Sequence, residues 1–266
     1  MFRESIQDAW QARYGTDAPM EADLGALLNH RSVRKFKAEP VEESLVSLLI
    51  GAAQSAATSS NLQLYSFVSV QEPSRREAIA RLCDPNPQVR SAPWFFAVFA
   101  DHWRAREAAK AAGHEPSSLS YAEFYTMAVV DAALAAERMV CAAETLGLGI
   151  CYIGGLRNHP DEVNRLLAAP KGVFGLFGLC IGWPEEPLRA EIKPRLSQAA
   201  VWFRDIFPAG IDAREYDERI APFYERQKVS GPPTWSEKTG QRLEPDHLGP
   251  RAAQKSFLED QGFLLD

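Results

Sequence analysis

Residues 121–146, YAEFYTMAVVDAALAAERMVCAAETL, form the longest apolar stretch of the chain and decide its fold class. The stretch is apolar almost all round at helical spacing, which predicts a long central helix inside a core. Asp131, Glu137 and Arg138 interrupt it, so it is a buried helix and not a membrane span. The glycines at positions 147 and 149 are expected to end it.

Nearly continuous apolar runs lie on either side of this helix and predict buried strands. These runs are residues 94–100 (WFFAVFA), 173–183 (VFGLFGLCIGW) and the short run that enters Gly154 and Gly155. Residues 64–70 predict a further strand. Helices are expected from Pro40 to Ala53, with Val41, Leu45, Leu48, Leu49, Ala52 and Ala53 on one face, and at 21–29, 74–82 and 159–167. The sequence thus predicts an α+β fold.

The end of the chain has a weaker pattern. Hydrophobic periodicity fades after about residue 200, and residues 228–251 are predicted to be a loop or an arm.

Composition excludes several classes of protein. The chain has 266 residues, 46% of them apolar and 24% charged, which fits one large domain or two small ones. A net charge of −6 argues against nucleic-acid and anionic-membrane partners. The first 15 residues are too polar for a signal peptide, so a cytoplasmic location is expected.

The common catalytic motifs are absent from the sequence. The four cysteines show no metal-ligand spacing and are expected to be small buried side chains, and the five histidines are scattered. We find no HExxH, GxSxG, Walker A or strand-linked GxGxxG pattern. A bound cofactor is therefore expected to carry the chemistry.

Cations gather at two places in this acidic chain. HRSVRKF, residues 30–36, sets arginines beside Ser32, and KPR, residues 193–195, holds two cations around a stiff proline. Both suit a phosphate, which accepts several charge-assisted hydrogen bonds. YIGGLR, residues 152–157, has adjacent glycines that let backbone amides approach a flat ligand. Taken singly, each feature is also consistent with a solvated turn.

The order of these motifs resembles the FMN-dependent nitroreductase family, in particular the nitroreductase A and flavin reductase P group. The matching stretches are HRSVRKF, ATSSNLQLYSF, AAETLGLGICYIGGLRNHPDEV, LFGLCIGWP, IKPRL, YDERIAPFY and TWS. They run in family order from about residue 22. The resemblance implies an N-terminal extension (1–20) and one FMN-binding domain (21–266), whose residues 200–266 form an arm over the active site and the partner subunit.

The resemblance further implies an intertwined homodimer with a mostly antiparallel sheet and FMN at the interface. Arg31 or Arg34 would stabilise reduced flavin near N1, and the Gly154 and Gly155 amides would face N5. The implied FMN contacts are His30, Arg31, Ser32, Val33, Arg34, Thr58, Ser59, Gln88, Val89, Arg90, Tyr152, Ile153, Gly154, Gly155, Lys193 and Arg195.

Two departures from the family pattern concern the substrate side. Asn61 stands where close relatives are expected to have an aromatic residue. The loop RQKVSGPP, residues 226–233, holds two cations where NADPH-selective relatives have several arginines. Strict NADPH selectivity is therefore not expected. The implied substrate and nucleotide contacts are Asn61, Gln63, Arg226, Lys228 and Arg251.

The function implied is a ping-pong NAD(P)H oxidoreductase, in which NAD(P)H reduces FMN and a flat acceptor then reoxidises it. Nitroaromatics, quinones, free flavin and metal oxyanions are all plausible acceptors, and no side-chain nucleophile is required. Three alternatives stay open: a flavoenzyme with one dedicated substrate, a non-catalytic protein that stores or delivers FMN, and an α+β domain that binds no flavin.

Overall fold

The computed structural model describes residues 5–20, 24–188 and 190–263. The chain forms two compact units, which are described separately. The sheet unit comprises Ser32–Pro187 and Gly249–Asp266, and the helical unit comprises Met1–Arg31 and Leu188–Leu248. The predicted N-terminal extension thus belongs to the same unit as residues 188–248.

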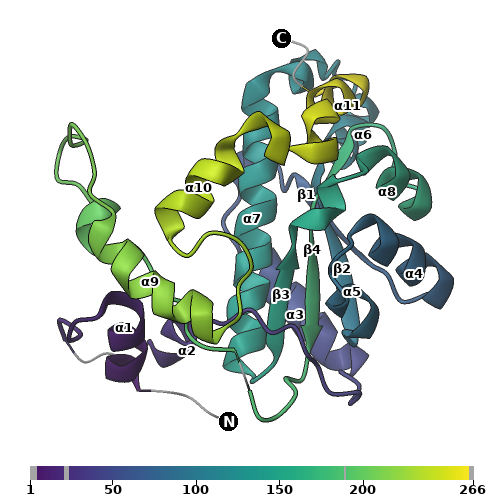
Figure 1. Cartoon of the computed structure of the whole chain (residues 1–266). Coiled ribbons are helices and arrows are strands. Elements are labelled where there is room, and N and C mark those ends of the chain that lie inside the picture. The colour runs from purple at the N-terminus through teal and green to yellow at the C-terminus, as the bar shows by residue number, and fades with distance from the viewer. Residues whose placement is uncertain (1–4, 21–23, 189, 264–266) are drawn as a thin grey trace. The chain divides into compact units, whose positions relative to one another are not determined.

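A four-stranded antiparallel sheet forms the centre of the sheet unit, as the sequence predicts (Figure 1). The strands follow the order β1-β2-β4-β3. Each neighbouring pair is antiparallel, and a single parallel bridge joins Ser32 to Ile150 on β3. The strands are β1 (Tyr65–Ser69), β2 (Trp94–Asp101), β3 (Gly149–Ile153) and β4 (Val173–Gly182).

Helices cover both faces of this sheet, which explains why β2 is apolar on both sides. Phe96 and Val98 point into a core with α3 (Glu43–Gln54) and α7 (Ala122–Thr145). Phe95 and Phe99 point the other way, toward α4 (Pro73–Leu82). The other helices of this unit are α5 (Gln88–Ser91), α6 (Trp103–Ala111), α8 (Pro160–Leu167) and α11 (Gln254–Asp260).

The glycines of β4 make room for large neighbours. A Cβ atom on Gly178 would lie 2.4 Å from the Phe95 ring, and one on Gly182 would lie 2.4 Å from the Pro93 ring. Glycine is therefore required here for side chains of the next strand to reach the core.

The central helix is confirmed, but it is not apolar and buried all round. Ala132, Ala136 and Met139 are fully buried against the sheet, whereas Val130 and Leu134 are 44% and 45% exposed on the outer face. Asp131, an apparent interruption in the sequence, has no exposed surface.

The helical unit has a small core of its own. Tyr216, Ile220 and Phe223 on α9 (Arg214–Arg226) are buried and pack with Leu196 and Trp235. The remaining helices of this unit are α1 (Ile6–Tyr14), α2 (Gly25–Leu28) and α10 (Trp235–Leu243). Short 3-10 turns in the two units are η1 (Ser59–Asn61), η2 (Ser117–Ser120), η3 (Gly154–Arg157), η4 (Gln198–Ala200), η5 (Pro245–His247) and η6 (Gly249–Ala253).

Several sequence predictions were wrong in detail. The helix expected from Pro40 begins at Glu43, and Leu48, expected on its buried face, is 69% exposed. Residues 228–251 are not a bare arm, because α10 lies within them. The Thr234 side chain accepts a hydrogen bond from the Glu237 amide, and this capping box was a usable signal in the sequence.

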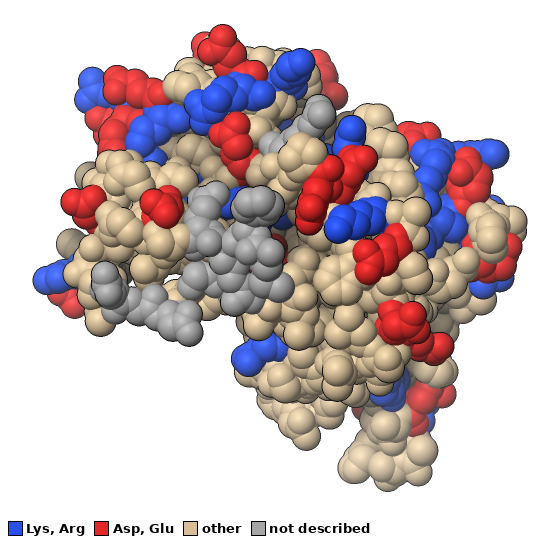
Figure 2. All heavy atoms as spheres, turned by 90° about the horizontal axis from the view of Figure 1, so that it is seen from below, with Lys and Arg blue, Asp and Glu red and all other residues tan. Residues whose placement is uncertain are grey.

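The surface shown in Figure 2 carries both signs of charge, with lysine and arginine side chains beside acidic ones over much of that face. Among the described residues, no helix is long and apolar enough to cross a membrane.

Candidate functional site

A cleft of about 540 Å³ in the sheet unit brings together two of the predicted cofactor contacts, Arg34 and Gln88. Arg34 is exposed, whereas Gln88 at the start of α5 is only 3% exposed. The full lining consists of Arg34, Lys35, Phe36, Pro85, Asn86, Pro87, Gln88, Ser91 and Glu185. Two cations and a buried amide in one cleft suit an anionic or polar planar ligand.

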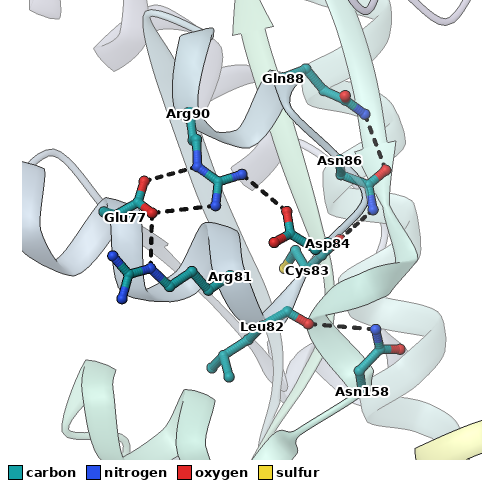
Figure 3. Close-up of polar contacts among 9 residues, drawn as sticks. All are labelled: Glu77, Arg81, Leu82, Cys83, Asp84, Asn86, Gln88, Arg90 and Asn158. Atoms are coloured by element: carbon teal, nitrogen blue, oxygen red, sulfur yellow. Dashed lines mark hydrogen bonds and ion pairs between the residues drawn. The ribbon is translucent and has the colours of Figure 1, made fainter.

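Hydrogen bonds hold the Gln88 amide in place (Figure 3). Its Nε2 donates to Asn86 Oδ1 at 3.2 Å, as the figure shows. Nε2 also donates to Cys151 Sγ at 3.6 Å. Asn86 in turn donates from Nδ2 to the Cys83 carbonyl at 2.5 Å. The amide is thus oriented before any ligand binds.

The predicted Gly-Gly turn packs against the same segment. A Cβ atom on Gly155 would lie 2.8 Å from the Cys83 carbonyl oxygen and 3.3 Å from Asn86 Nδ2. Any larger residue would therefore push η3 away from residues 83–86. Asn86 lines the cleft and also touches Gly155, so the turn and the cleft are adjacent.

Arg251 on η6 lies against this turn. Its Nη2 donates to the Gly154 carbonyl at 3.0 Å, and its Nε donates to Asn158 Oδ1 at 2.9 Å. Asn158 also donates to the Leu82 carbonyl at 3.4 Å (Figure 3). The arginine that the sequence assigned to the substrate side therefore contacts the backbone of the predicted flavin-facing turn.

Two predicted cofactor contacts on α5 have other partners. The Arg90 guanidinium pairs with Glu77 at 2.8 Å and with Asp84 at 3.0 Å (Figure 3). Val89 is fully buried, and its carbonyl accepts from Arg76. These contacts fix α5 and the loop before it.

The loop that holds Thr58, Ser59, Asn61 and Gln63 is set by one carboxylate that sequence reasoning missed. Asp131 Oδ1 accepts from the Ser59 amide at 2.8 Å, and Oδ2 accepts from the Leu64 amide at 3.1 Å. The two bonds bracket the loop at its ends.

Backbone strain marks this loop. Ser60, Asn61 and Gln63 have φ values of 49°, 57° and 53°, in the left-handed region that glycine favours. All three side chains are exposed. A strained loop held by a buried carboxylate is typical of ligand-contacting segments.

The predicted contacts on β3 point to opposite faces of the sheet, and the basic loop is bonded to the same strand. Tyr152 donates to Glu137 on α7 at 3.0 Å, and burial together with that carboxylate raises the pKa of the tyrosine hydroxyl well above its usual value. Ile153 is buried on the opposite face. Val33 is buried, and its amide donates to the Ile150 carbonyl at 2.8 Å, so Ser32 and Arg34 start from a fixed backbone.

In the helical unit, the backbone of the KPR segment is pinned. Pro194 is buried and its carbonyl accepts from the Tyr216 hydroxyl at 3.0 Å, while the Lys193 and Arg195 side chains are exposed. Arg219 donates to the Arg195 carbonyl at 3.0 Å. His30 and Arg31 belong to this unit as well, and both are half-buried.

The two cations predicted to read the nucleotide differ in their surroundings. Arg226 pairs with Glu191 at 2.9 Å, and Gln227 donates to the same carboxylate at 2.9 Å. The hydrogen bond from Arg226 holds the pKa of Glu191 below its usual value. Lys228 is exposed and has a φ of 50°.

The cysteines near the cleft are protonated at neutral pH. Burial raises the pKa of Cys83 to about 12, and burial also raises the pKa of Cys151 and Cys180. A protonated buried thiol is a poor nucleophile. The arrangement can thus bind and orient a ligand, but these thiols offer it no covalent catalyst.

Comparison with protein-family models establishes the family to which the chain belongs. The nitroreductase family model matches residues 27–183, and the model for the C-terminal domain of that family matches residues 193–266. The chain belongs to the nitroreductase family. The family resemblance inferred from the sequence motifs is therefore confirmed, and so is the α+β fold class.

Characterised relatives and solved structures agree with this membership. An FMN reductase (NADPH) of Bacillus subtilis is 34% identical over 92% of this chain and 99% of its own length. An oxygen-insensitive NADPH nitroreductase of Salmonella typhimurium is 36% identical over 82% of this chain and 89% of its own.

A solved nitroreductase structure from B. subtilis superposes with a TM-score of 0.84 at 34% identity. It covers 91% of this chain and 98% of its own. An NADPH:FMN oxidoreductase of Vibrio harveyi, solved with NAD+, superposes with a TM-score of 0.79 at 28% identity over 91% of this chain and 98% of its own.

Proposed function

We propose that this member of the nitroreductase family is an FMN-dependent NAD(P)H oxidoreductase that reduces flat organic acceptors. The observation that carries the proposal is the cleft in which Arg34 and the oriented Gln88 amide lie next to the Gly154–Gly155 turn. Membership of the family and the named activities of relatives that match nearly their whole length support it.

The residues of the sheet unit fit the ring system of FMN. Arg34 supplies positive charge for the pyrimidine end of a flavin, where reduction places negative charge. Gln88 offers its amide Oε1 as an acceptor for the polar edge of the ring, because Asn86 and Cys151 already take both hydrogens of Nε2. Gly154 is partly exposed, so its backbone can meet a flat ligand, whereas Gly155 is buried against the Cys83 carbonyl and Asn86.

The residues of the helical unit fit the phosphate of FMN. His30, Arg31, Lys193 and Arg195 present donors and charge suited to a dianion. The carbonyls of His30, Pro194 and Arg195 accept hydrogen bonds, which fix the backbone from which these side chains extend. Thr58, Ser59 and Ser32 are the hydroxyl-bearing contacts of the same proposal.

When bound, FMN would take a hydride from NAD(P)H and pass the electrons to the acceptor. The chain itself binds, orients and shields the reactants, and no protein nucleophile takes part. Asn61 and Gln63, exposed on the strained loop, are proposed to contact the acceptor. Nitroaromatics, quinones and free flavin are acceptors of suitable shape, and the enzyme is proposed to act in the cytoplasm.

The identity of the bound flavin tests this proposal. Purified protein is expected to be yellow and to release FMN, and not FAD, on denaturation, because the predicted cation sites fit one terminal phosphate. Mass spectrometry of the released flavin makes the distinction. Colourless protein that cannot be reconstituted with FMN would refute the proposal.

A homodimer is also proposed, through the outer face of α7. Val130 and Leu134 are exposed large apolar side chains on one face of that helix, and Leu48 on neighbouring α3 is exposed too. Apolar side chains of this size on adjacent helices favour a protein interface.

The dimer is expected to dissociate when this face is charged. Val130→Asp together with Leu134→Asp should give monomers in sedimentation at micromolar concentration, because buried unpaired carboxylates are costly. Leu146→Asp, a change at an apolar residue just beyond the end of α7 that is 44% exposed, serves as the matched control and should stay dimeric. A wild-type monomer that still binds FMN would contradict the proposal.

Selectivity for NADPH over NADH is expected to be modest. Each exposed ion pair contributes at most about 1 kcal/mol, so Arg226 and Lys228 together allow a ratio of roughly thirtyfold at most. The ionised Glu191 carboxylate competes with the 2′-phosphate for Arg226, which reduces the ratio further.

Glu191→Gln should therefore raise the NADPH:NADH ratio of kcat/KM, by roughly fivefold at most. Arg226→Ala should lower it. The measurement is steady-state kinetics with both nucleotides and one acceptor. A wild-type ratio above about a thousandfold that none of these substitutions, nor Lys228→Ala, changes would show that other residues read the phosphate.

A further inference from the structure

The first helix of the chain buries an arginine as well as an apolar side chain. The residues of α1 that are buried are Ala9 and Arg13, and Arg13 is only 5% exposed. A buried guanidinium is costly unless its donors are satisfied, so the partners of Arg13 explain why α1 lies where it does.

Those partners are backbone carbonyls of the two basic segments. Arg13 Nε donates to the Leu28 carbonyl at 2.9 Å, and Nη2 donates to the His30 carbonyl at 3.2 Å. Nη1 reaches the Lys193 carbonyl at 3.5 Å. One guanidinium thus joins the start of the basic loop to the start of the KPR segment.

The backbone of Arg13 also contacts the KPR segment. Its carbonyl accepts from the Arg195 amide at 2.9 Å and from Arg219 Nη1 at 2.7 Å. Gly15, with a φ of 70°, ends α1 directly after this point, and a Cβ atom there would lie 3.0 Å from the Arg219 side chain. Because glycine has no Cβ atom, the end of α1 can pack closely against Arg219 on α9.

Each carbonyl of the KPR segment is consequently held by a different donor. Arg13 holds that of Lys193, the Tyr216 hydroxyl holds that of Pro194, and Arg219 holds that of Arg195. The backbone of residues 193–195 is thus fixed, while the side chains of Lys193 and Arg195 are exposed.

We propose that Arg13 is a positioning residue that sets the spacing between His30–Arg31 and the KPR segment within the helical unit, and so tunes binding of the flavin phosphate. The proposal rests on the proposed FMN site. Arg13 lies outside both family matches, which begin at residues 27 and 193. The N-terminal extension thereby gains a role in cofactor binding.

Riboflavin, which lacks the phosphate, separates this role from a general effect on the fold. Flavin-free full-length protein is titrated with FMN and with riboflavin, and the ratio of the two affinities is the readout. Arg13→Ala should lower FMN affinity about tenfold and leave riboflavin affinity within about twofold of wild type. Arg13→Lys should resemble Arg13→Ala, because one ammonium cannot span carbonyls that a guanidinium fork joins.

Two further variants keep the test decisive. Tyr216→Phe removes a single hydroxyl from the KPR carbonyls and should lower the ratio about threefold or more, even if Arg13→Ala fails to fold. Arg106→Ala removes an arginine bond to the Lys171 carbonyl in the sheet unit and should leave the ratio unchanged.

The outcomes distinguish this proposal from the proposed function. An unchanged FMN:riboflavin ratio in folded Arg13→Ala, or in Tyr216→Phe, overturns the role of Arg13 while the FMN site stands. Full recovery in Arg13→Lys overturns the geometric role in favour of simple charge. Wild-type protein that binds both flavins equally overturns the phosphate site itself.

Discussion

Arg34→Ala is expected to weaken FMN binding by roughly ten- to hundredfold. The side chain lines the cleft beside Gln88, and a charge-assisted hydrogen bond contributes about 1.5–3 kcal/mol. Each 1.4 kcal/mol is about a factor of ten in affinity. Arg31→Ala is expected to show a loss of the same order, through the phosphate. Fluorescence titration of FMN into the flavin-free variants measures both.

The control is an exposed arginine that lies away from the cleft. Arg165 on α8 pairs with Glu162 at 3.6 Å, and Arg165→Ala should leave FMN affinity unchanged. The two cofactor variants should differ in one respect: riboflavin affinity should fall in Arg34→Ala, which contacts the ring, and hold in Arg31→Ala. If FMN affinity is unchanged in both, the basic loop is a solvated turn and the assignment of the site is wrong.

Asp131→Ala is expected to destabilise the protein by about 2–4 kcal/mol and to impair use of the acceptor. The substitution leaves the Ser59 and Leu64 amides without their carboxylate partner, and an unsatisfied buried donor costs about 1–3 kcal/mol. Ser60, Asn61 and Gln63 then lose the contact that holds them in the left-handed region. Denaturant unfolding measures the first effect, and steady-state kinetics with a quinone measures the second.

A functional role for this loop is separated from mere stability by a matched variant. Asn164→Leu removes a buried hydrogen bond, 2.8 Å long, to the Val173 carbonyl on the far side of the sheet. It should lower stability without raising the KM for the acceptor, whereas Asp131→Asn should raise that KM roughly fivefold or more, equivalent to about 1 kcal/mol. Equal KM values in the two variants would limit Asp131 to a structural role.

The parts of the fold that the sequence predicts best are those buried on both sides. β2 and β4 are apolar on every residue that faces a helix layer, so their runs cannot be mistaken for surface segments. Helix α7 is predicted from its long apolar stretch, although its outer face is exposed at Val130 and Leu134. By contrast, α9 and α10 are mostly polar. On α9 the buried residues Tyr216, Ile220 and Phe223 form a narrow stripe at helical spacing, and α10 buries none of its residues.

Some residues of the candidate site could be predicted from the sequence, and others could not. Arg34, Gln88 and Gly155 could be named because their residue types and order carry the family pattern. The positioning contacts could not. Asp131 reads as a break in an apolar helix, and its partners lie 72 and 67 residues away in sequence. The sequence predicts Arg90 as an FMN contact, and only the fold shows Glu77 and Asp84 beside it.

The proposed function requires that the chain catalyse electron transfer through bound FMN. The most direct measurement is to add NADPH or NADH to the purified flavoprotein without oxygen, follow the visible absorbance of the flavin, and then add a quinone or a nitroaromatic. If the proposed function is correct, the nucleotide bleaches the flavin and the acceptor restores its colour. A flavin that keeps its absorbance with either nucleotide, yet is bleached by dithionite, would contradict the proposed oxidoreductase activity. It would indicate a protein that stores or delivers FMN.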